Sequence, residues 1–369
     1  MDVYEITHPR ASLDARAAAV PIDCPRVGNW ACYPTRVARV SVVEAIRERV
    51  AATGLLGPSG PVVVMLSGGR DSTCLLDLAV SIVGRPDVQA MHVNYGLRAA
   101  ADADERHCQE LCDALGVELS VQRALDLRPR AGNLQAWARE LRYEAAAALA
   151  AARAADIAAG HTATDQVETI LYRLASSPSR RALLGMRPRE GSLIRPLLEL
   201  SREQTGAYCR ERGLGWRDDE SNATGAYARG RVRHQLVPIL REIHPAAEAN
   251  ILLLAQRLRD EAEVLDALVD RELGGRHEIE LARLRALPVA IARLVVARLA
   301  DAVKGRPVPG PSSRLQDILA MRDTGTVHLD LPGGVRATVL DGQLSFSPTP
   351  PAPSRGDASS GSDTYTERP

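Results

Sequence analysis

The hydrophobic positions of the chain change their spacing in a regular way between residues 60 and 176. Four short apolar runs, at 61–66, 88–94, 117–125 and 155–161, have the length and the aliphatic content of buried strands. Each run is followed by a longer stretch in which apolar residues recur every three or four positions, as on one face of a helix. Four strand–helix units in series predict an α/β fold with a parallel sheet and helices on both of its faces.

Further segments extend this pattern on both sides. Residues 41–56 have helical spacing and predict a helix ahead of the first strand. Residues 192–200 predict another strand or extended segment, and a helix at 201–213 follows, with Ser201 as its candidate N-cap.

The spacing changes again beyond residue 232. Apolar residues there recur every three or four positions without strand-like runs, which predicts a second, smaller and mainly helical domain. A short β-hairpin within 325–347 closes this domain, and Pro, Ser and Gly dominate the residues after it. We therefore predict four regions: a poorly structured N-terminal extension at 1–40, a parallel-sheet domain at 41–232, the mainly helical domain at 233–346 and a disordered tail at 347–369.

Charge and composition limit the classes of partner. The 46 basic and 46 acidic residues give a net charge of +0, so a nucleic-acid partner would need a local basic patch. Lys304 is the only lysine, which leaves no catalytic lysine in the predicted sheet domain. No apolar run reaches the roughly 18 residues that span a bilayer, and the N-terminus lacks the features of a secretory signal. We predict a cytoplasmic protein with no membrane partner.

The six cysteines are scattered along the chain without a C-x-x-C pair. Such usage is typical of a reduced cytosolic protein. Cys108 and Cys112 stand four residues apart on a predicted helix and are candidates for two metal ligands, but no second pair accompanies them. The preferred interpretation is that they are ordinary half-buried cysteines.

The stretch LSGGRDS at 66–72 joins the first predicted strand to the next helix. It therefore lies at the carboxyl end of a parallel strand, where open α/β sheets bind ligands. Gly68 and Gly69 lack a Cβ, so backbone N–H groups can approach an anion, and the N-terminus of the following helix adds partial positive charge. The stretch is neither a Walker A nor a G-x-G-x-x-G motif. We predict a phosphate or pyrophosphate site, and the alternative is a tight turn that merely contains glycines.

The S-G-G-x-D-S pattern resembles the pyrophosphate loop of the PP-loop ATP pyrophosphatase family, whose members cleave ATP between the α and β phosphates and activate a carbonyl oxygen as an adenylate. The resemblance implies that ATP is bound by the loop residues Ser67, Gly68, Gly69, Arg70, Asp71 and Ser72. A carboxylate beside phosphates repels them, so we expect Asp71 to hold Mg²⁺ against the pyrophosphate and to be a catalytic residue. ATP and Mg²⁺ are thus the expected cofactors.

Further stretches narrow the resemblance. They are HVNYGLR at 92–98, ARELRY at 138–143, GHTATDQVET at 160–169, RPLLELSR at 195–202 and DDESNATGAYARGRVR at 218–233. Together with the loop and in this order, they resemble the tRNA(Ile)-lysidine synthetase family over most of the chain. The resemblance implies ATP-dependent ligation of L-lysine to C2 of the wobble cytidine of tRNA(Ile) with a CAU anticodon, through an adenylated cytidine, with release of AMP and pyrophosphate. It makes the sheet domain catalytic and the helical domain the binding domain for tRNA or substrate.

Three residues after the fourth predicted strand form the expected lysine site. His161, Asp165 and Glu168 stand at i, i+4 and i+7 and are expected on one face of a helix. A free amino acid with a cationic side chain needs carboxylates, and one of its nitrogens must lose a proton before it attacks. We predict that Asp165 and Glu168 bind lysine, and that His161 accepts a proton or contacts the adenylate, so that His161 and Asp165 are candidate catalytic residues. The alternatives are acids that only complement the helix dipole, and a metal-binding triad.

Arginines supply the remaining candidate contacts, since a planar guanidinium binds phosphate or orients a base by fork geometry. The predicted tRNA or phosphate contacts are Arg98, Arg139, Arg142, Arg195, Arg229, Arg231 and Arg233. The last three belong to the densest basic run, which would give salt-dependent affinity for RNA. A solvated basic helix is the alternative.

The sequence departs from the family pattern at several positions. Tyr95 stands where a His is usual, and Thr162 and Thr164 replace a His and an Asp, which leaves the contacts of these positions open. Two other functions stay in view: a tRNA thiolase, which would need a catalytic cysteine pair or a C-x-x-C-bound cluster, and a non-catalytic RNA-binding protein with a relic ATP loop. The oligomeric state is open, with a homodimer as one form to test.

Overall fold

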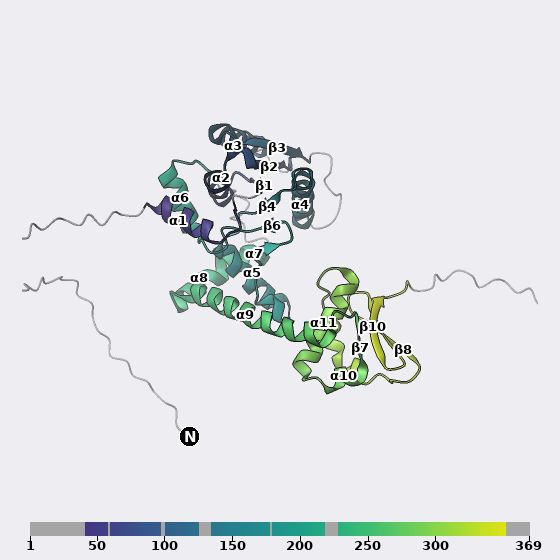
Figure 1. Ribbon diagram of the computed structural model, residues 1–369. Helices are drawn as coiled ribbons and strands as arrows, with labels where there is room; N and C mark the ends of the chain where they lie inside the picture. The colour runs from purple at the N-terminus through teal and green to yellow at the C-terminus, as the bar shows by residue number, and fades with distance from the viewer. Residues whose placement is uncertain are drawn as a thin grey trace, which may run out of the picture. The chain divides into compact units, whose positions relative to one another are not determined.

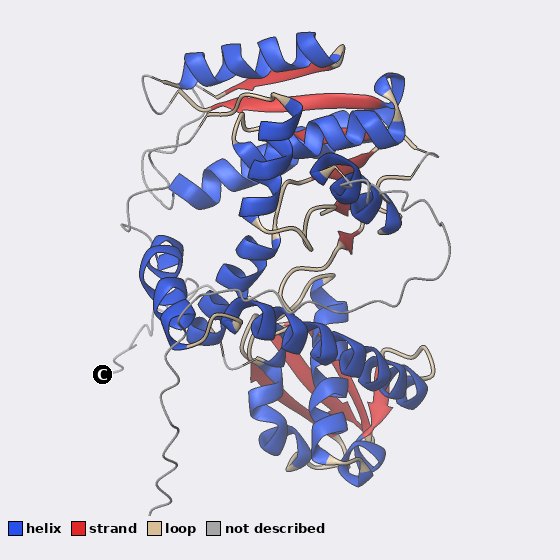
Figure 2. Ribbon diagram, turned by 90° about the vertical axis from the view of Figure 1, so that its left-hand side faces the viewer, coloured by secondary structure: helices blue, strands red, loops and turns tan. Residues whose placement is uncertain are grey.

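The computed structural model describes residues 41–57, 60–96, 100–124, 134–177, 179–217 and 228–351, the side chain of Gln135 excepted. These residues form an N-terminal body around a six-stranded sheet and a C-terminal body around a four-stranded sheet, each with its own helices (Figure 1, Figure 2). The predicted extension at 1–40, most of the predicted tail and Arg98 lie outside the described residues.

The N-terminal body, residues 42–243, follows the predicted alternation of strands and helices. Its strands are β1 (Val62–Met65), β2 (Val88–Asn94), β3 (Glu118–Arg123), β4 (Asp156–Ala158), β5 (Arg189–Glu190) and β6 (Leu193–Ile194). Its α-helices are α1 (Val42–Ala52), α2 (Arg70–Val83), α3 (Ala101–Leu115), α4 (Leu134–Arg153), α5 (Ala163–Ser176), α6 (Arg202–Arg212), α7 (Ala228–Arg231) and α8 (Val237–Ile243). Shorter segments are η1 (Arg85–Asp87), η2 (Arg180–Ala182) and the π-helical η4 (Val232–Leu236).

The strand order β3-β2-β1-β4-β6-β5 places β1 inside the sheet. β1 pairs in parallel with β2 on one side, where Val62 lies opposite Val88, and with β4 on the other, where Val62 lies opposite Asp156. The chain therefore builds the sheet outward from β1 to β3 and then crosses to β4. In open α/β sheets, ligands bind at the carboxyl ends of the two strands between which the order reverses, which here are β1 and β4.

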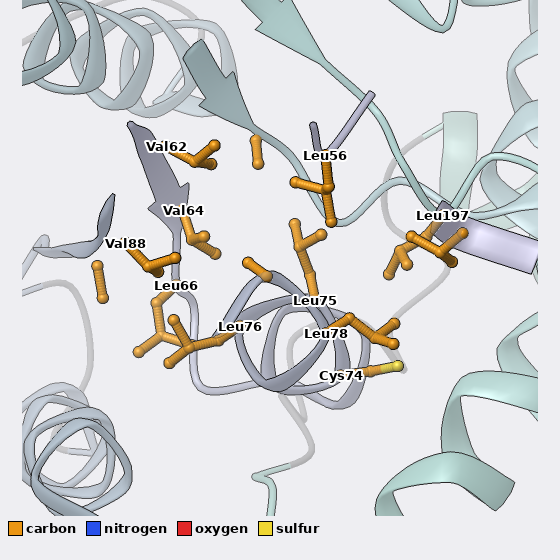
Figure 3. Close-up of a cluster of buried hydrophobic side chains, with 14 of the residues drawn as sticks. Leu56, Val62, Val64, Leu66, Cys74, Leu75, Leu76, Leu78, Val88 and Leu197 are labelled. Atoms are coloured by element: carbon orange, nitrogen blue, oxygen red, sulfur yellow. The ribbon is translucent and has the colours of Figure 1, made fainter. Parts of the chain in front are cut away.

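β1 is buried on both faces because its residues alternate between two cores. Val62, Val64 and the following Leu66 lie in a core with α2 residues such as Leu75 and Leu78 (Figure 3), to which α1, α3 and α6 also contribute. Val63 and Met65 pack on the other face with α4. A strand with both faces buried is a continuous apolar run, which explains why this segment is recognisable in the sequence. The two cores fix the strand ends and hence the loops that follow them.

The predicted α/β class is confirmed, and the differences lie at one edge of the sheet. β6 keeps only two residues of the predicted segment 192–200, because Pro196 lacks the N–H that a ladder needs and the chain turns there. β5 pairs antiparallel with β6 and has no counterpart in the prediction, since two residues leave no periodic pattern.

The C-terminal body is organised around an antiparallel sheet of order β7-β10-β9-β8. Its strands are β7 (Glu278–Glu280), β8 (Thr326–Leu331), β9 (Val335–Leu340) and β10 (Gln343–Pro348). Its helices are α9 (Ala247–Leu273), α10 (Leu281–Ala286), α11 (Val289–Lys304) and α12 (Leu315–Leu319), with the 3-10 turn η5 (Pro311–Arg314). α9 and α11 share one apolar core with the sheet, in which Val296, Ile318 and Val339 are fully buried.

The predicted hairpin near the C-terminus is present and is extended by a third strand, β10, and an edge strand, β7. The turns of this sheet lie at Gly333-Gly334 and at Asp341-Gly342, and all four residues have positive φ. The boundary predicted at 232/233 stays a prediction, and η4 begins there. None of the described helices is long and apolar enough to cross a membrane.

An ion pair between the buried Asp77 and the half-exposed Arg212 links α2 to α6. Asp77, which is 1% exposed, accepts a hydrogen bond from the Tyr208 hydroxyl at 2.6 Å and two from the Arg212 guanidinium at 2.8 and 2.9 Å. Tyr208 is as deeply buried as Asp77, and burial raises the pKa of its hydroxyl. The pair therefore satisfies polar groups that the packing of α6 on α2 removes from water.

We expect Asp77→Ala to lower the free energy of unfolding by about 2–3 kcal/mol, mainly because the Tyr208 hydroxyl is left buried without its acceptor. Arg212 is nearly half exposed, so water takes over much of its solvation. Urea denaturation measures the change, and Glu110→Ala on the exposed side of α3 is the matched control. A loss of less than about 0.5 kcal/mol would show that the pair does not hold the two helices together.

Candidate functional site

Residues 66–69 connect β1 to α2 at the point where the strand order reverses, and the loop is held by its own serines. The Ser72 hydroxyl donates to the Gly69 carbonyl at 2.9 Å and accepts from the Ser67 N–H at 3.1 Å. The two serine hydroxyls lie 3.0 Å apart, and the Gly69 N–H reaches that of Ser67 at 3.3 Å. The serines of the motif thus shape the loop before any ligand binds.

Gly68 has a φ of +78°, and a Cβ there would lie 3.2 Å from Cys108 Sγ on α3. Both the backbone conformation and the space therefore favour glycine. Behind the loop, His92 Nδ1 donates to the Leu66 carbonyl at 2.9 Å, and burial lowers the pKa of His92, which keeps the ring neutral. The loop is therefore fixed from β2 and α3 as well as from within.

Asp71 is the second residue of α2 and is mostly buried. Thr205 on α6 donates to its carboxylate at 2.5 Å, and the Nε atoms of Arg70 and Arg202 lie 3.5 and 3.3 Å from its oxygens. Burial raises the pKa of Asp71, the Thr205 hydrogen bond and the Arg202 charge oppose the rise, and the charge of Asp165 adds to it. Two carboxylates therefore approach each other beside the loop.

The loop after β4 packs directly on the start of α2. A Cβ on Gly160 would lie 3.1–3.2 Å from backbone atoms of Asp71 and Ser72, closer than nearly all real Cβ contacts. Glycine is therefore what allows this backbone-to-backbone contact. It brings the residues that follow β4 against the phosphate-type loop.

The first turns of α5 and α6 are joined at the same place. The Ala163 N–H donates to the Leu200 carbonyl at 2.8 Å, and the Arg202 N–H donates to the Thr164 hydroxyl at 3.3 Å. The N-termini of α2, α5 and α6 therefore meet near Asp71. Their unpaired N–H groups and partial positive charges favour an anion.

His161 lies just before α5, whose N-cap is Thr162, rather than within the helix. Its Nδ1 is buried and has no hydrogen-bond partner among the described residues. Burial lowers the pKa of His161 to about 4; the Asp165 charge opposes this, and nearby arginines, Arg195 foremost, act in the same direction as burial. The ring is therefore neutral near pH 7 and has a free nitrogen to accept a proton.

Asp165 completes a capping box with Thr162. Its carboxylate accepts from the Thr162 N–H at 2.9 Å and from the Thr162 hydroxyl at 2.8 Å, and the Asp165 N–H points back to that hydroxyl. Asp165 therefore does stabilise the start of the helix, which was the alternative considered for this acid. The capping hydrogen bonds use one carboxylate oxygen, and the other faces the site.

Glu168 pairs with Arg233 of η4. The guanidinium donates from Nε and Nη2 to the carboxylate at 2.5 and 2.9 Å, and Nη2 also lies 3.4 Å from Asp165 Oδ1. Burial lowers the pKa of Arg233, but the Glu168 pairing and the Asp165 charge outweigh it. The predicted carboxylate face exists, and in this structure it holds a cation of the chain itself; the predicted contact of Arg233 with tRNA or phosphate stays a prediction.

Three of the predicted arginines lie near His161. Arg139 and Arg195 line a cavity of about 550 Å³ with Tyr143, over whose ring the Arg139 guanidinium lies at 4.6 Å. The Nε atoms of Arg142 and Arg195 are buried without a partner in the described structure. Buried cationic donors beside a cavity suit an anionic or nucleotide ligand.

Two predicted arginines remain, and they lie on α7, while two further residues of the site were not predicted. Arg229 donates to the Thr169 hydroxyl at 3.2 Å, and Arg231 is exposed on the same short helix. Arg202 and Thr205 contact Asp71 but were not among the predicted site residues. Their signal was available, because they open the helix capped by Ser201 at the ligand edge of the sheet.

Metal-binding alternatives find no support in the described part of the chain. The cysteines it contains, Cys74, Cys108, Cys112 and Cys209, are buried and not in disulfides. No group of three or more His, Cys, Asp or Glu side chains among these residues could hold a metal ion by itself. A protein-only metal cluster, as a metal-dependent thiolase would need, is therefore not found there.

Comparison with known proteins agrees with this geometry. A family model described as "PP-loop domain" matches residues 46–240. The chain is 39% identical to the tRNA(Ile)-lysidine synthase of Pseudomonas fluorescens over 65% of this chain and 56% of that protein. It is 36% identical to that of Symbiobacterium thermophilum (84% and 70%) and 34% identical to that of Thermus thermophilus (84% and 60%). The chain thus spans 56–70% of the length of these relatives.

Among solved structures, the U34-tRNA thiolase NcsA from Methanococcus maripaludis with its [4Fe-4S] cluster has a TM-score of 0.50. The match covers 59% of this chain and 78% of the thiolase at 16% identity, so it bears on the fold alone. The family model and the more similar relatives carry the assignment: the chain belongs to the PP-loop family and, within it, to the tRNA(Ile)-lysidine synthases.

Proposed function

We propose that the protein ligates L-lysine to C2 of the wobble cytidine of tRNA(Ile) with a CAU anticodon, and converts ATP to AMP and pyrophosphate. The observation that carries the proposal is the contact between the loop 67–72 and the segment that carries Asp165 and Glu168. The loop suits a triphosphate, and the carboxylate face suits a cationic nucleophile. The name of the relatives at 34–39% identity supports the same activity.

ATP would bind with its pyrophosphate portion on the loop and the N-terminus of α2. Ser67, Gly68, Gly69, Arg70, Asp71 and Ser72 are the proposed contacts. A Mg²⁺ ion bound by nucleotide phosphates needs only one or two protein carboxylates. Asp71 fits this requirement, because burial and the Asp165 charge both raise its pKa, and a cation would relieve both effects. Mg²⁺ held there would neutralise phosphate charge.

Lysine would bind at Asp165 and Glu168. The Arg233 guanidinium contacts both carboxylates, so this face accommodates a side-chain cation, and a lysine ammonium carries the same charge. A bound lysine would share or displace this pairing. The Asp165 charge acts on Asp71, so a lysine bound at this face would lie beside the adenylate.

The chemistry has two steps. The cytidine O2 attacks the α phosphorus and pyrophosphate leaves; the lysine amine then attacks C2 and AMP leaves. The attacking amine must lose a proton, and neutral His161 with its unpartnered Nδ1 is the proposed acceptor, with Asp165 as the second candidate.

The tRNA would present its wobble base to this site outside the base stack. Arg139, Arg142 and Arg195 are proposed to bind the flipped nucleotide or its phosphates. Arg98, Arg229, Arg231 and Arg233 are proposed to contact the RNA backbone, and residues 233–346 are proposed to bind the tRNA body. Free buried thiols and a tRNA partner fit a reducing, cytoplasmic compartment.

We expect Asp71→Asn to reduce pyrophosphate release and lysine incorporation into tRNA(Ile) by about 100-fold or more, because the carboxylate that would hold Mg²⁺ is lost. Radiolabelled lysine and a coupled pyrophosphate assay measure both, and Asp87→Asn on η1 is the control. Pyrophosphate release without lysine incorporation by the wild type would keep the adenylating loop and disprove the lysine assignment.

Glu168→Gln should raise the KM for lysine about tenfold or more while the KM for ATP changes less than about twofold. Removing the charge weakens the cation site but leaves the nucleotide loop intact. Glu144→Gln, an exposed carboxylate on α4, is the matched control, and thermal denaturation checks that unpairing Arg233 has not unfolded the variant. Equal effects on the two KM values would argue against a lysine site at Glu168.

His161 should make the protein less stable in mild acid. Its folded-state pKa of about 4 lies below its ordinary value of 6.5, so the unfolded state binds the proton more readily. The contribution of the neutral ring to the free energy of unfolding is fully present above pH 6.5 and is lost as the pH falls toward 4. In urea titrations from pH 7 to 4, the wild type should lose more stability than His161→Gln; parallel curves would contradict the buried neutral ring.

A further inference from the structure

Arg202 stands where the three helix N-termini meet, and its guanidinium forms an ion pair with Asp71 but no side-chain hydrogen bond among the described residues. It is the first residue of α6, and its Nε lies 3.3 Å from Asp71 Oδ2. The alignment is nevertheless too poor for a hydrogen bond, and this Nε is buried without a partner among the described residues. The side chain is 28% exposed, so the end of the guanidinium can reach a ligand.

Arg70 repeats this arrangement on the other side of the same carboxylate. Its Nε lies 3.5 Å from Asp71 Oδ1 and is likewise buried without a partner in the described structure. Within those residues, only the Thr205 hydroxyl donates a hydrogen bond to the Asp71 carboxylate. Buried charged donors normally have hydrogen-bond acceptors, whereas these two Nε atoms reach Asp71 only as ion pairs. Two guanidinium groups beside an anion-type loop therefore keep donor capacity for a further acceptor.

Other arginines of the site are engaged elsewhere. Arg233 gives its hydrogen bonds to Glu168, and Arg195 gives its terminal nitrogens to the Arg187 carbonyl and to Glu190. Arg202 and Arg70 are therefore the cations next to Asp71 that remain available for a ligand.

A glycine of α6 packs against the Arg70 side chain of α2. Gly206 faces α2, and a Cβ there would lie 3.1 Å from Arg70 Cδ and 3.3 Å from Arg210 Nη1. The absent Cβ thus leaves room for the Arg70 side chain between α2 and α6. Arg70 and Arg202 therefore lie on the two helices that flank the Asp71 carboxylate.

We propose that Arg202 is a catalytic residue of the adenylation step and that its guanidinium binds the pyrophosphate that leaves ATP. In this step a bond forms between the cytidine O2 and the α phosphorus. The bond from the α phosphorus to the bridging oxygen breaks, and its electron pair stays on the pyrophosphate. Arg202 donates to the oxygens that gain this charge, a contact that is stronger in the transition state than in bound ATP. The inference rests on the proposed function.

The test compares Arg202→Ala and Arg202→Lys with Arg210→Ala, which removes the same charge two turns further along α6. We expect Arg202→Ala to weaken the binding of inorganic pyrophosphate, measured by calorimetry, about tenfold or more. It should lower kcat for pyrophosphate release about 100-fold while the KM for lysine is unchanged. Arg202→Lys should restore part of the pyrophosphate affinity and part of kcat, since an ammonium group supplies the charge without the paired donors of a guanidinium. Arg210→Ala should match the wild type.

The outcomes separate the inference from the function on which it rests. If the wild type binds pyrophosphate and releases it from ATP with tRNA present, but Arg202→Ala does both equally well, the inference is wrong and the function stands. If Arg202 only neutralises Asp71, Arg202→Ala will lose thermal stability and keep its pyrophosphate affinity, and this result also overturns the inference. If the wild type neither binds nor releases pyrophosphate, the proposed function itself fails. Should Arg202→Ala not fold, Arg202→Lys and Arg202→Gln give the same comparison.

Discussion

The backbone contact between Gly160 and the start of α2 is the constraint on which the site depends. A Cβ at Gly160 would lie 3.1–3.2 Å from peptide atoms of Asp71 and Ser72, and the two segments would have to separate by a few tenths of an ångström. His161 and the first turn of α5 would move with the loop after β4, since they follow it directly. The absence of a Cβ at Gly160 therefore lets the loop after β4 contact the loop after β1 at the ligand edge of the sheet. The parallel pairing of β1 with β4 alone would not bring these two loops so close.

The electrostatics of the site rest on arginine. Asp71 has two guanidinium neighbours and Glu168 has one, so each buried acid is partly compensated before a ligand arrives. Arginine keeps its charge at any pH at which proteins are folded, whereas buried lysine or histidine loses it. His161 shows the contrast, since the same surroundings leave it neutral. The site therefore combines guanidinium groups that keep their charge with an imidazole that stays neutral near pH 7.

Much of the fold, and part of the site, can be predicted from the sequence for local reasons. Strands such as Val62–Met65 are continuous apolar runs because both faces are buried, and Ser201 and Thr162 cap helices through residues three positions away. The loop motif is local as well. The features that the sequence does not predict depend on tertiary packing. They are the pairing of Arg233 with Glu168, the contact of Thr205 with Asp71, and the two-residue strand β5, and they have no periodic or short-range sequence pattern. The lysine and tRNA assignments came from family resemblance and not from these patterns.

The hydrogen bond from Thr205 to Asp71 has a consequence for synthesis on the ribosome. It joins residues 134 positions apart, so the loop leaves the ribosome long before the helix that completes its surroundings. At about 5–20 residues per second, α6 follows the loop by roughly 7–27 s. A nascent chain that stops before α6 has the whole loop motif and the strand before it, yet not the hydroxyl and guanidinium that Asp71 contacts. The surroundings of Asp71 are therefore completed late in translation, after all six strands of the N-terminal sheet have been made.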